Sequence, residues 1–71
     1  MNRIPVTSSH LASVAYDQAT NTLEVEFEQG GVYQYYGVPA AVHAALMVAS
    51  SVGTYFAANV KKAGYSYKRV G

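Results

Sequence analysis

One stretch decides the fold of this chain: residues 23–36, which run Leu23-Glu24-Val25-Glu26-Phe27-Glu28-Gln29-Gly30-Gly31-Val32-Tyr33-Gln34-Tyr35-Tyr36. Its first six residues alternate apolar and acidic side chains, which is typical of a strand with one face on a core and the other in water. The paired glycines can adopt the positive φ values of a tight connection, and the aromatic residues after them suit a returning strand. The stretch therefore predicts a β-hairpin.

The length of the hairpin loop decides which face carries the tyrosines. A two-residue loop over residues 30–31 places Phe27 opposite Gln34. Tyr33 and Tyr35 then join the acidic face as an exposed platform. A one-residue change of register moves every side chain to the other face, so only one of the two arrangements can hold.

The alternative is a three-residue loop over residues 29–31, with its last glycine in the left-handed conformation of a bulge. Phe27 then pairs with Tyr33, and Val25 pairs with Tyr35 in the core. We favour this register, because aromatic and β-branched cross-strand pairs stabilise a sheet by about 0.2–1 kcal/mol each. In it, both tyrosine hydroxyls are expected to reach polar partners at the margin of the sheet, and Tyr36 to lie outside.

The sequence on either side of the hairpin supplies further elements. Residues 9–16 are predicted to form a strand, although their alternation is imperfect, and residues 17–21 a turn. After the hairpin, Pro39 suits the first turn of a helix that continues through good helix formers to Ala49. A second helix is predicted over residues 54–62.

This second helix places Phe56 and Val60 at i, i+4 spacing on one face. Ser50 and Ser51 separate the two helices and can cap the second. Gly64 is expected to end the second helix. Residues 65–70 then form a last strand or an extended tail.

We therefore predict a single domain over residues 1–71 of the α+β class. Its small antiparallel sheet has the order β-β-β-α-α-β, with two short helices packed on one face and the segment from Tyr65 at the sheet edge. The residues predicted to hold this structure together are Val25, Phe27, Tyr33, Tyr35 and Phe56.

The composition indicates the class of protein and its expected location in the cell. Hydrophobic residues make up 51% of the chain and charged residues 13%, which indicates a globular rather than a disordered chain. The chain has no cysteine, so neither a disulfide nor a thiolate metal site supports the fold. The N-terminus lacks the apolar segment of a secretory signal, and the most apolar run, residues 38–52, is shorter than the roughly 20 residues of a membrane span. We expect a cytoplasmic protein.

Formal charges are missing between Glu28 and Lys61. Helices of small proteins normally carry charges on their wet faces, so the uncharged helix predicts a contact surface for a protein partner or a weak homodimer. The competing explanation is a simple tolerance for alanine, which carries little apolar area. The residues predicted for this contact are Tyr36, Ala41, Ala44, Ala45 and Val48.

The C-terminal end interleaves basic and aromatic residues, a combination that follows a phosphate backbone while stacking on bases. The competing explanation is a helix end whose lysines complement the helix dipole, followed by an ordinary edge strand. The residues predicted to contact nucleic acid are Lys61, Lys62, Tyr65, Tyr67, Lys68 and Arg69.

Catalysis has the least support. His10 and His43 fall on different predicted elements, and a nucleophile needs a base in convergent geometry rather than beside it in sequence. The alternating glutamates are explained by a solvated strand face. No cysteine nucleophile, phosphate loop or metal-ligand cluster occurs. We predict a protein without enzyme activity, cofactor or metal.

With these segments placed, the chain resembles the KTSC domain family, a small domain named from the C-terminus of some lysyl-tRNA synthetases that also occurs alone in bacteria and phages. The resemblance rests on Ser8-Ser9, Tyr16-Asp17, Leu23-x-Val25-x-Phe27, Tyr33-x-Tyr35, Val38-Pro39, Ser51-x-Gly53-x-Tyr55-Phe56 and Tyr65-x-Tyr67. It implies a fold and, through the synthetase context, an association with RNA. The family has no settled activity.

This chain departs from the family pattern at Ala57, where a polar residue such as asparagine is common, and in its uncharged first helix. These departures favour a binding surface that is particular to this chain rather than a polar site shared across the family. We predict a non-enzymatic RNA- or nucleoprotein-associated accessory module. The alternative is a protein-interaction module that docks on a larger machine, such as a phage or bacterial transcription regulator binding RNA polymerase.

Overall fold

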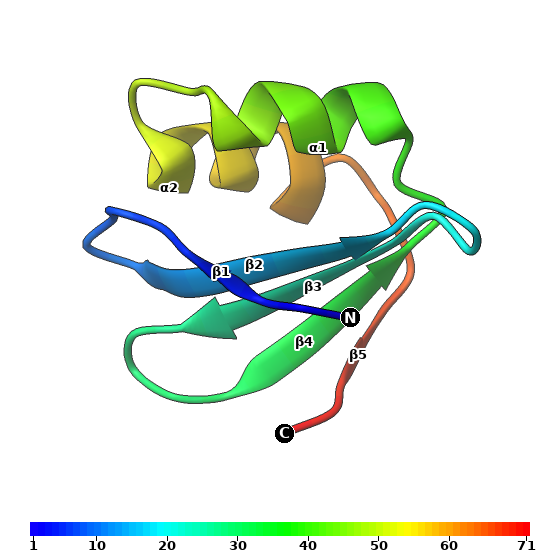
Figure 1. Ribbon diagram of the computed structural model, residues 1–71, viewed down its shortest axis with the longest axis horizontal. Coiled ribbons are helices and arrows are strands. Elements are labelled where there is room, and N and C mark those ends of the chain that lie inside the picture. Colours follow the sequence, from blue (N-terminus) through cyan, green and yellow to red (C-terminus); the bar gives the residue numbers. More distant parts are fainter.

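Two layers make up the computed structural model, which describes residues 1–71: an antiparallel sheet and a pair of short helices over one of its faces (Figure 1). The strands are β1 (Ile4–Pro5), β2 (Leu11–Asp17), β3 (Thr22–Phe27), β4 (Val32–Tyr36) and β5 (Tyr67–Arg69). The helices are α1 (Ala40–Met47) and α2 (Val52–Phe56), and α2 continues into a π-helical turn, η1 (Ala57–Lys61). The predicted α+β class, helix layer and closing edge strand are confirmed.

The strand order across the sheet is β1-β2-β3-β4-β5, so each strand lies beside its neighbours in the sequence. The helices form the connection from β4 to β5 and cover the sheet on the way. None of the helices is long and apolar enough to cross a membrane.

The predicted order lacks β1, so the observed order is β-β-β-β-α-α-β. This strand consists of two exposed residues, with Ile4 opposite Val14 and Pro5 opposite Ser13. A segment this short has no alternation to detect. It forms because the edge of β2 offers unpaired backbone groups, which edge strands commonly cover.

The β3–β4 hairpin buries the predicted face in a different register. Val25 lies opposite Tyr33 and Leu23 opposite Tyr35, so the predicted pairs of Phe27 with Tyr33 and of Val25 with Tyr35 are wrong by two residues. A shift of two residues preserves the face of every side chain. Both tyrosines therefore lie on the helix-covered face, as the favoured arrangement requires.

The shift arises because the loop is Glu28–Gly30, one residue earlier than predicted. The Gly30 amide donates to the Phe27 carbonyl (2.9 Å), and the Phe27 amide donates to the Gly31 carbonyl (3.1 Å). Gly31 thus already pairs with β3, at a φ of +93° that favours glycine. A Cβ there would also come within 3.3 Å of the Tyr33 ring, so the residue is constrained on two counts.

A β-bulge explains the imperfect alternation of β2. Leu11 lies opposite Phe27, whereas Ser13 lies opposite Glu26, so one additional residue fits into β2 between the two pairs. The bulge reverses the alternation, and Leu11 and Val14 consequently both enter the core.

The core lies between the sheet and the helices. Its nine buried members are Leu11, Val14, Leu23, Val25, Tyr35, Val38, Leu46, Phe56 and Val60. The Phe56 ring meets Tyr35 and Phe27 edge to face, with centroids 5.4 and 5.7 Å apart. Phe27 and Tyr33 are partly buried and pack against this cluster. The aromatic residues of the hairpin thus hold the second helix on the sheet.

Local signals end the helices largely as expected. The Ser51 hydroxyl accepts a hydrogen bond from the Thr54 amide (3.4 Å) and caps α2. Gly64 adopts a φ of +90° beyond η1, as suits a helix stop. Helix α1 ends at Met47, two residues before the predicted Ala49.

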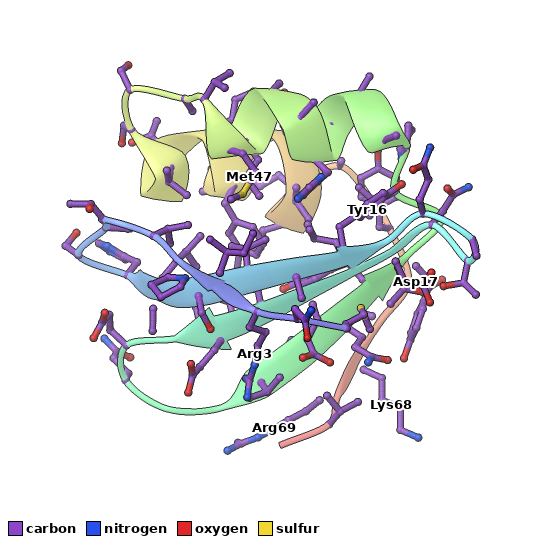
Figure 2. All side chains as sticks on the ribbon, viewed as in Figure 1. Arg3, Tyr16, Asp17, Met47, Lys68 and Arg69 are labelled. Atoms are coloured by element: carbon purple, nitrogen blue, oxygen red, sulfur yellow. The ribbon has the colours of Figure 1, made fainter.

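Tyr16 fastens β2 to the start of α1. Its hydroxyl donates to the Val38 carbonyl (2.6 Å), and its ring stacks on that of His43 with centroids 4.6 Å apart. Figure 2 shows Tyr16 between the sheet and the helix layer. Burial lowers the pKa of His43.

Candidate nucleic-acid interface

An open pocket of about 470 Å³ lies where the β3–β4 hairpin and β5 approach the end of η1. Its walls include the rings of Phe27, Tyr33, Tyr35 and Tyr67, and Lys61 lies at the same opening. We refer to it as the tyrosine pocket.

The rings of the tyrosine pocket are packed to different depths. Tyr35 is 5% exposed and forms its floor, whereas Tyr67, on the edge strand, is 64% exposed. The Tyr67 centroid lies 5.5 Å from that of Tyr35 and 6.3 Å from that of Tyr33. Tyr67 therefore presents an open aromatic surface that is supported from behind by other rings.

The hydroxyls of these tyrosines have no hydrogen-bond partner within the protein. Among the tyrosines, only Tyr16 and Tyr36 form hydrogen bonds through their hydroxyls. No buried side-chain oxygen or nitrogen lacks a partner, so the other hydroxyls are open to solvent. The polar partners expected for Tyr33 and Tyr35 at the sheet margin are therefore absent. Both hydroxyls lie in the open pocket, where water can satisfy them.

Electrostatics keep the floor of the pocket neutral and its edge positive. Burial raises the pKa of Tyr35, and the neighbouring Tyr67 and Tyr33 raise it further, so ionisation of its hydroxyl is disfavoured. The Arg69 guanidinium carbon lies 5.9 Å from the Tyr33 ring centroid, within the range of a cation–π contact. The Arg69 Nε donates to the Gly71 carbonyl (2.9 Å), which holds the side chain along the edge of the sheet.

Three of the predicted nucleic-acid residues come together here. Lys61 and Tyr67 line the tyrosine pocket, and Arg69 lies against its Tyr33 wall. Tyr65 is half-buried and packs against the core.

Lys62 and Lys68 lie elsewhere. Lys62 borders a different pocket, between α2 and the loop before β2. Lys68 lies opposite Gln34 on the face of the sheet that the helices leave uncovered. Figure 2 shows the side chains of Lys68 and Arg69 leaving β5 in different directions.

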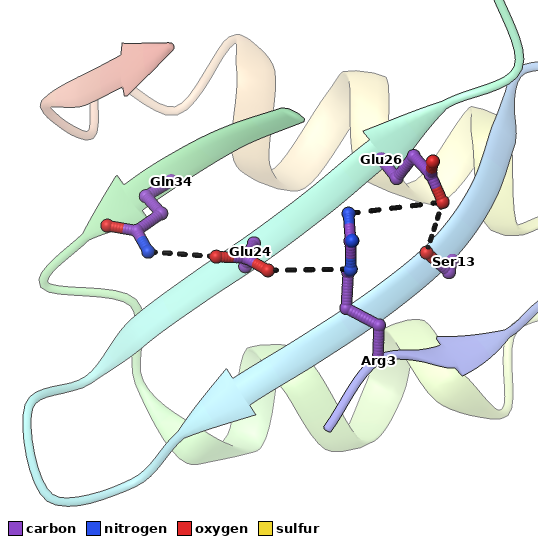
Figure 3. Close-up of polar contacts among 5 residues, drawn as sticks. All are labelled: Arg3, Ser13, Glu24, Glu26 and Gln34. Carbon is purple, nitrogen blue, oxygen red and sulfur yellow. Dashed lines mark hydrogen bonds and ion pairs between the residues drawn. The ribbon is translucent and has the colours of Figure 1, made fainter. Parts of the chain in front are cut away.

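The uncovered face of the sheet carries a polar network rather than a site (Figure 3). Arg3 bridges Glu24 and Glu26, at N–O distances of 3.6 and 3.9 Å. The Ser13 hydroxyl donates to Glu26 and the Gln34 amide to Glu24, each at 2.9 Å. Both glutamates are thus occupied by neighbours, and no group of three His, Asp or Glu residues is placed to hold a metal ion.

The serine and histidine before β2 are close without forming a triad. Ser9 Oγ lies 2.8 Å from His10 Nδ1, and both residues are exposed. No hydrogen bond or ion pair joins His10 to a carboxylate that could orient its ring.

The residues predicted for protein contact fall on two surfaces. Ala41, Ala44 and Val48 are exposed on or just after α1, and Val48 is 83% exposed. Ala45 is half-buried. Tyr36 lies on the uncovered face of the sheet, where its hydroxyl donates to Gln34 Oε1 (3.1 Å).

The π-helical turn η1 was not predicted from the sequence, which carries no local signal for it. The Lys62 amide donates to the Ala57 carbonyl five residues earlier (3.1 Å), where an α-helix would use the carbonyl four residues earlier. This turn buries Val60 and ends with Lys61 at one pocket and Lys62 at another. Such turns are frequent at functional sites.

Comparisons with known proteins agree with this architecture. The KTSC domain family matches residues 7–70. The crystal structure of a KTSC domain protein from Yersinia pestis superposes with a TM-score of 0.87 at 41% identity and covers 99% of this chain and 97% of that one. An uncharacterized protein of Stutzerimonas stutzeri is 41% identical over 70 residues, 99% of each chain.

A partial match comes from a larger enzyme. The lysine–tRNA ligase of Nostoc punctiforme is 42% identical over 48 residues, which is 68% of this chain but 9% of the ligase. The family match and the Yersinia pestis structure agree on one assignment: this chain belongs to the KTSC domain family.

Proposed function

We propose that this protein is a non-enzymatic, cytoplasmic accessory module that binds an unpaired segment of RNA through the tyrosine pocket. The observation that carries the proposal is an exposed ring, Tyr67, beside hydroxyls with no partner in the protein and beside the cations of Lys61 and Arg69. A base stacks on an aromatic ring whatever its identity, and each such stack contributes about 1–3 kcal/mol.

The arrangement favours single strands over duplexes. Bases in a duplex are already stacked on one another, whereas an unpaired base can turn toward Tyr67 and offer its edge to the Tyr33 and Tyr35 hydroxyls. Lys61 and Arg69 are then available for the adjoining phosphates. With only these cations at the site, binding is expected to be weak.

The relatives support the same class of partner. A segment similar to this chain forms part of a protein named lysine–tRNA ligase, whose name specifies an RNA. A module attached to such an enzyme is in position to add an RNA contact.

The test is fluorescence anisotropy with a labelled single-stranded RNA, compared with its duplex, at several salt concentrations. Two phosphate contacts predict a slope of log K against log salt of about −1.4, or about a sevenfold loss of affinity between 50 and 200 mM salt. Lys61→Met should reduce the magnitude of that slope by about 0.7. Lys68→Met, on the uncovered face of the sheet, is the matched control and should leave affinity unchanged. An affinity that does not change with salt concentration, or that falls equally in Lys61→Met and Lys68→Met, contradicts the proposal.

A second candidate rests on Val48, an apolar side chain 83% exposed next to the exposed Ala41 and Ala44 of a helix without charges. A protein partner, such as RNA polymerase or a second copy of this chain, would cover that surface. A nuclease-treated pull-down that Ala44→Glu abolishes supports this function. A monomer at all concentrations whose Ala44→Glu variant retains every partner counts against it.

A further inference from the structure

A second open pocket, of about 490 Å³, lies between the loop before β2 and the start of α2. Figure 1 shows this loop and α2 at the same end of the molecule. Hydroxyl side chains from both segments surround it: Thr7, Ser8, Ser9, Ser50, Ser51 and Thr54. We refer to it as the hydroxyl pocket. It shares no lining residue with the tyrosine pocket.

The ionisable groups of the hydroxyl pocket favour a negative ligand. Lys62 and His10 are its ionisable lining residues, and no aspartate or glutamate lines it. Lys62 forms no salt bridge, and both ion pairs of the protein involve Arg3. Its ammonium group is therefore available to a ligand, without a neighbouring carboxylate to oppose an anion.

The hydrogen bonds of the hydroxyl pocket leave two hydroxyl hydrogens free to donate. Ser8 Oγ accepts from the His10 amide (3.2 Å) and the Leu11 amide (3.3 Å), which leaves its own hydrogen to donate. Thr54 Oγ1 accepts from the Ser51 hydroxyl (2.9 Å), and its own hydrogen is likewise left over.

His10 adds a third donor. When the Ser9 hydroxyl donates to His10 Nδ1 across their 2.8 Å contact, the neutral ring carries its hydrogen on Nε2. When the ring is protonated, both nitrogens donate. In these forms Nε2 can donate to an anion, whereas in the other neutral tautomer, with Nδ1 donating to Ser9 Oγ, it is an acceptor, so an anion selects the first arrangement.

Gly53 allows the two segments to approach each other. A Cβ at this position would lie 3.2 Å from Ser8 Oγ and 3.9 Å from His10 Nδ1. An alanine here would crowd Ser8 Oγ, whose hydrogen is free, whereas its contact with His10 would be an ordinary one. The close approach thus keeps the donors of both segments within one pocket.

We propose that the hydroxyl pocket binds a phosphate group, with Lys62 as its counter-charge and Ser8, His10 and Thr54 as donors. A phosphate offers mostly acceptor oxygens together with a negative charge, which complements a site with free donors and one cation. The source is either free phosphate or the phosphate of a nucleotide. The proposal does not depend on RNA binding at the tyrosine pocket.

The experiment follows backbone amide shifts of the full ¹⁵N-labelled chain as inorganic phosphate is added at pH 7 and constant ionic strength. Saturable shifts are expected for His10, Gly53 and Thr54. Lys62→Met should weaken binding by about tenfold, the usual effect of losing one hydrogen bond to a charged group. Lys68→Met, on the uncovered sheet face, should leave it unchanged. Shifts that do not saturate, or an equal loss in both variants, overturn the proposal.

Two further arms identify the source of the phosphate and the role of the glycine. Adenosine 5′-monophosphate that binds more tightly than phosphate at the same residues, while adenosine alone does not bind there, supports a nucleotide source. Equal affinity for the monophosphate and phosphate supports free phosphate. Adenosine that shifts the pocket as strongly as its monophosphate overturns the proposal. Gly53→Ala should weaken phosphate binding while the spectrum stays dispersed, and Lys62→Met remains decisive if this variant unfolds.

Discussion

Removal of the hydroxyl group from Tyr16 should reduce the stability of this protein, whereas the same removal from Tyr35 should leave stability nearly unchanged and weaken RNA binding. The Tyr35 ring is 5% exposed, yet its hydroxyl has no partner within the protein. The Tyr16 hydroxyl donates to the carbonyl of Val38, a residue that is fully buried. Tyr35→Phe and Tyr16→Phe are therefore the same chemical change in two different environments.

The expected changes in the free energy of unfolding depend on which polar groups each substitution leaves unpaired. Tyr16→Phe removes a hydrogen bond with a net contribution of about 0.5–1.5 kcal/mol and leaves a buried carbonyl to bear a desolvation penalty of about 1–3 kcal/mol. We expect a loss of about 1–3 kcal/mol in the free energy of unfolding. In a domain of this size each kcal/mol lowers the melting temperature by about 4–8 °C. Tyr35→Phe leaves no protein group unpaired, so we expect a change within about 0.5 kcal/mol.

The assay is urea unfolding of the native protein and both variants, followed by far-ultraviolet circular dichroism. Equal slopes of free energy against urea would show that the comparison concerns stability alone. RNA binding provides the complementary measurement, in which Tyr35→Phe should weaken affinity and Tyr16→Phe should not. A loss of more than about 1 kcal/mol in Tyr35→Phe, or none in Tyr16→Phe, would refute the assignment of free and engaged hydroxyls.

Other perturbations test the core, the titration of a buried ring, a turn and the surface charges. Phe56→Ala should cost about 3–5 kcal/mol in urea unfolding, a large share of the roughly 4–11 kcal/mol expected for this length, and Phe56→Leu should cost less. Because burial lowers the pKa of His43 from 6.5, the folded state resists its protonation. The stability that comes from keeping His43 neutral is complete above pH 6.5 and is lost as the pH falls through the folded-state pKa. His43→Gln should reduce this loss of stability at low pH, as measured by melting curves over a pH series. Gly64→Ala places a side chain at a φ of +90° and should cost about 1 kcal/mol or more by thermal unfolding, whereas a neutral result would argue against this backbone conformation. Arg3→Met should cost less than about 1 kcal/mol, and its effect should shrink in high salt, because Arg3 is 37% exposed in both of its ion pairs.

Local pattern was sufficient for the elements with a clear period. The alternation of Leu23, Val25 and Phe27 with glutamates fixes which face of β3 is buried, since successive side chains of a strand point to opposite faces. The i, i+4 pair of Phe56 and Val60 likewise fixes the buried face of the second helix. These predictions depend only on neighbours along the chain, and the structure agrees with them.

Predictions that needed a distance between segments were less successful. The loop residues chosen for the hairpin were off by one, because Gly31 pairs with Phe27 instead of lying in the turn. A strand of two residues, Ile4–Pro5, has no pattern to detect and depends on an edge that exists only after β2 has folded. Neither feature has a local signal.

The sequence by itself determined the fold class, the buried faces and the presence of cations near aromatic residues at the C-terminal end. Only the tertiary structure decided which of those cations share a surface. Lys61 and Lys62 are adjacent in the chain, yet they border separate pockets, and Lys68 lies on the far face of the sheet from both. The free hydroxyls of the tyrosine pocket and the facing donors of the hydroxyl pocket arise in the same way. Each pocket joins segments distant in sequence, whose separation is set by the packing of the whole domain rather than by any period along the chain.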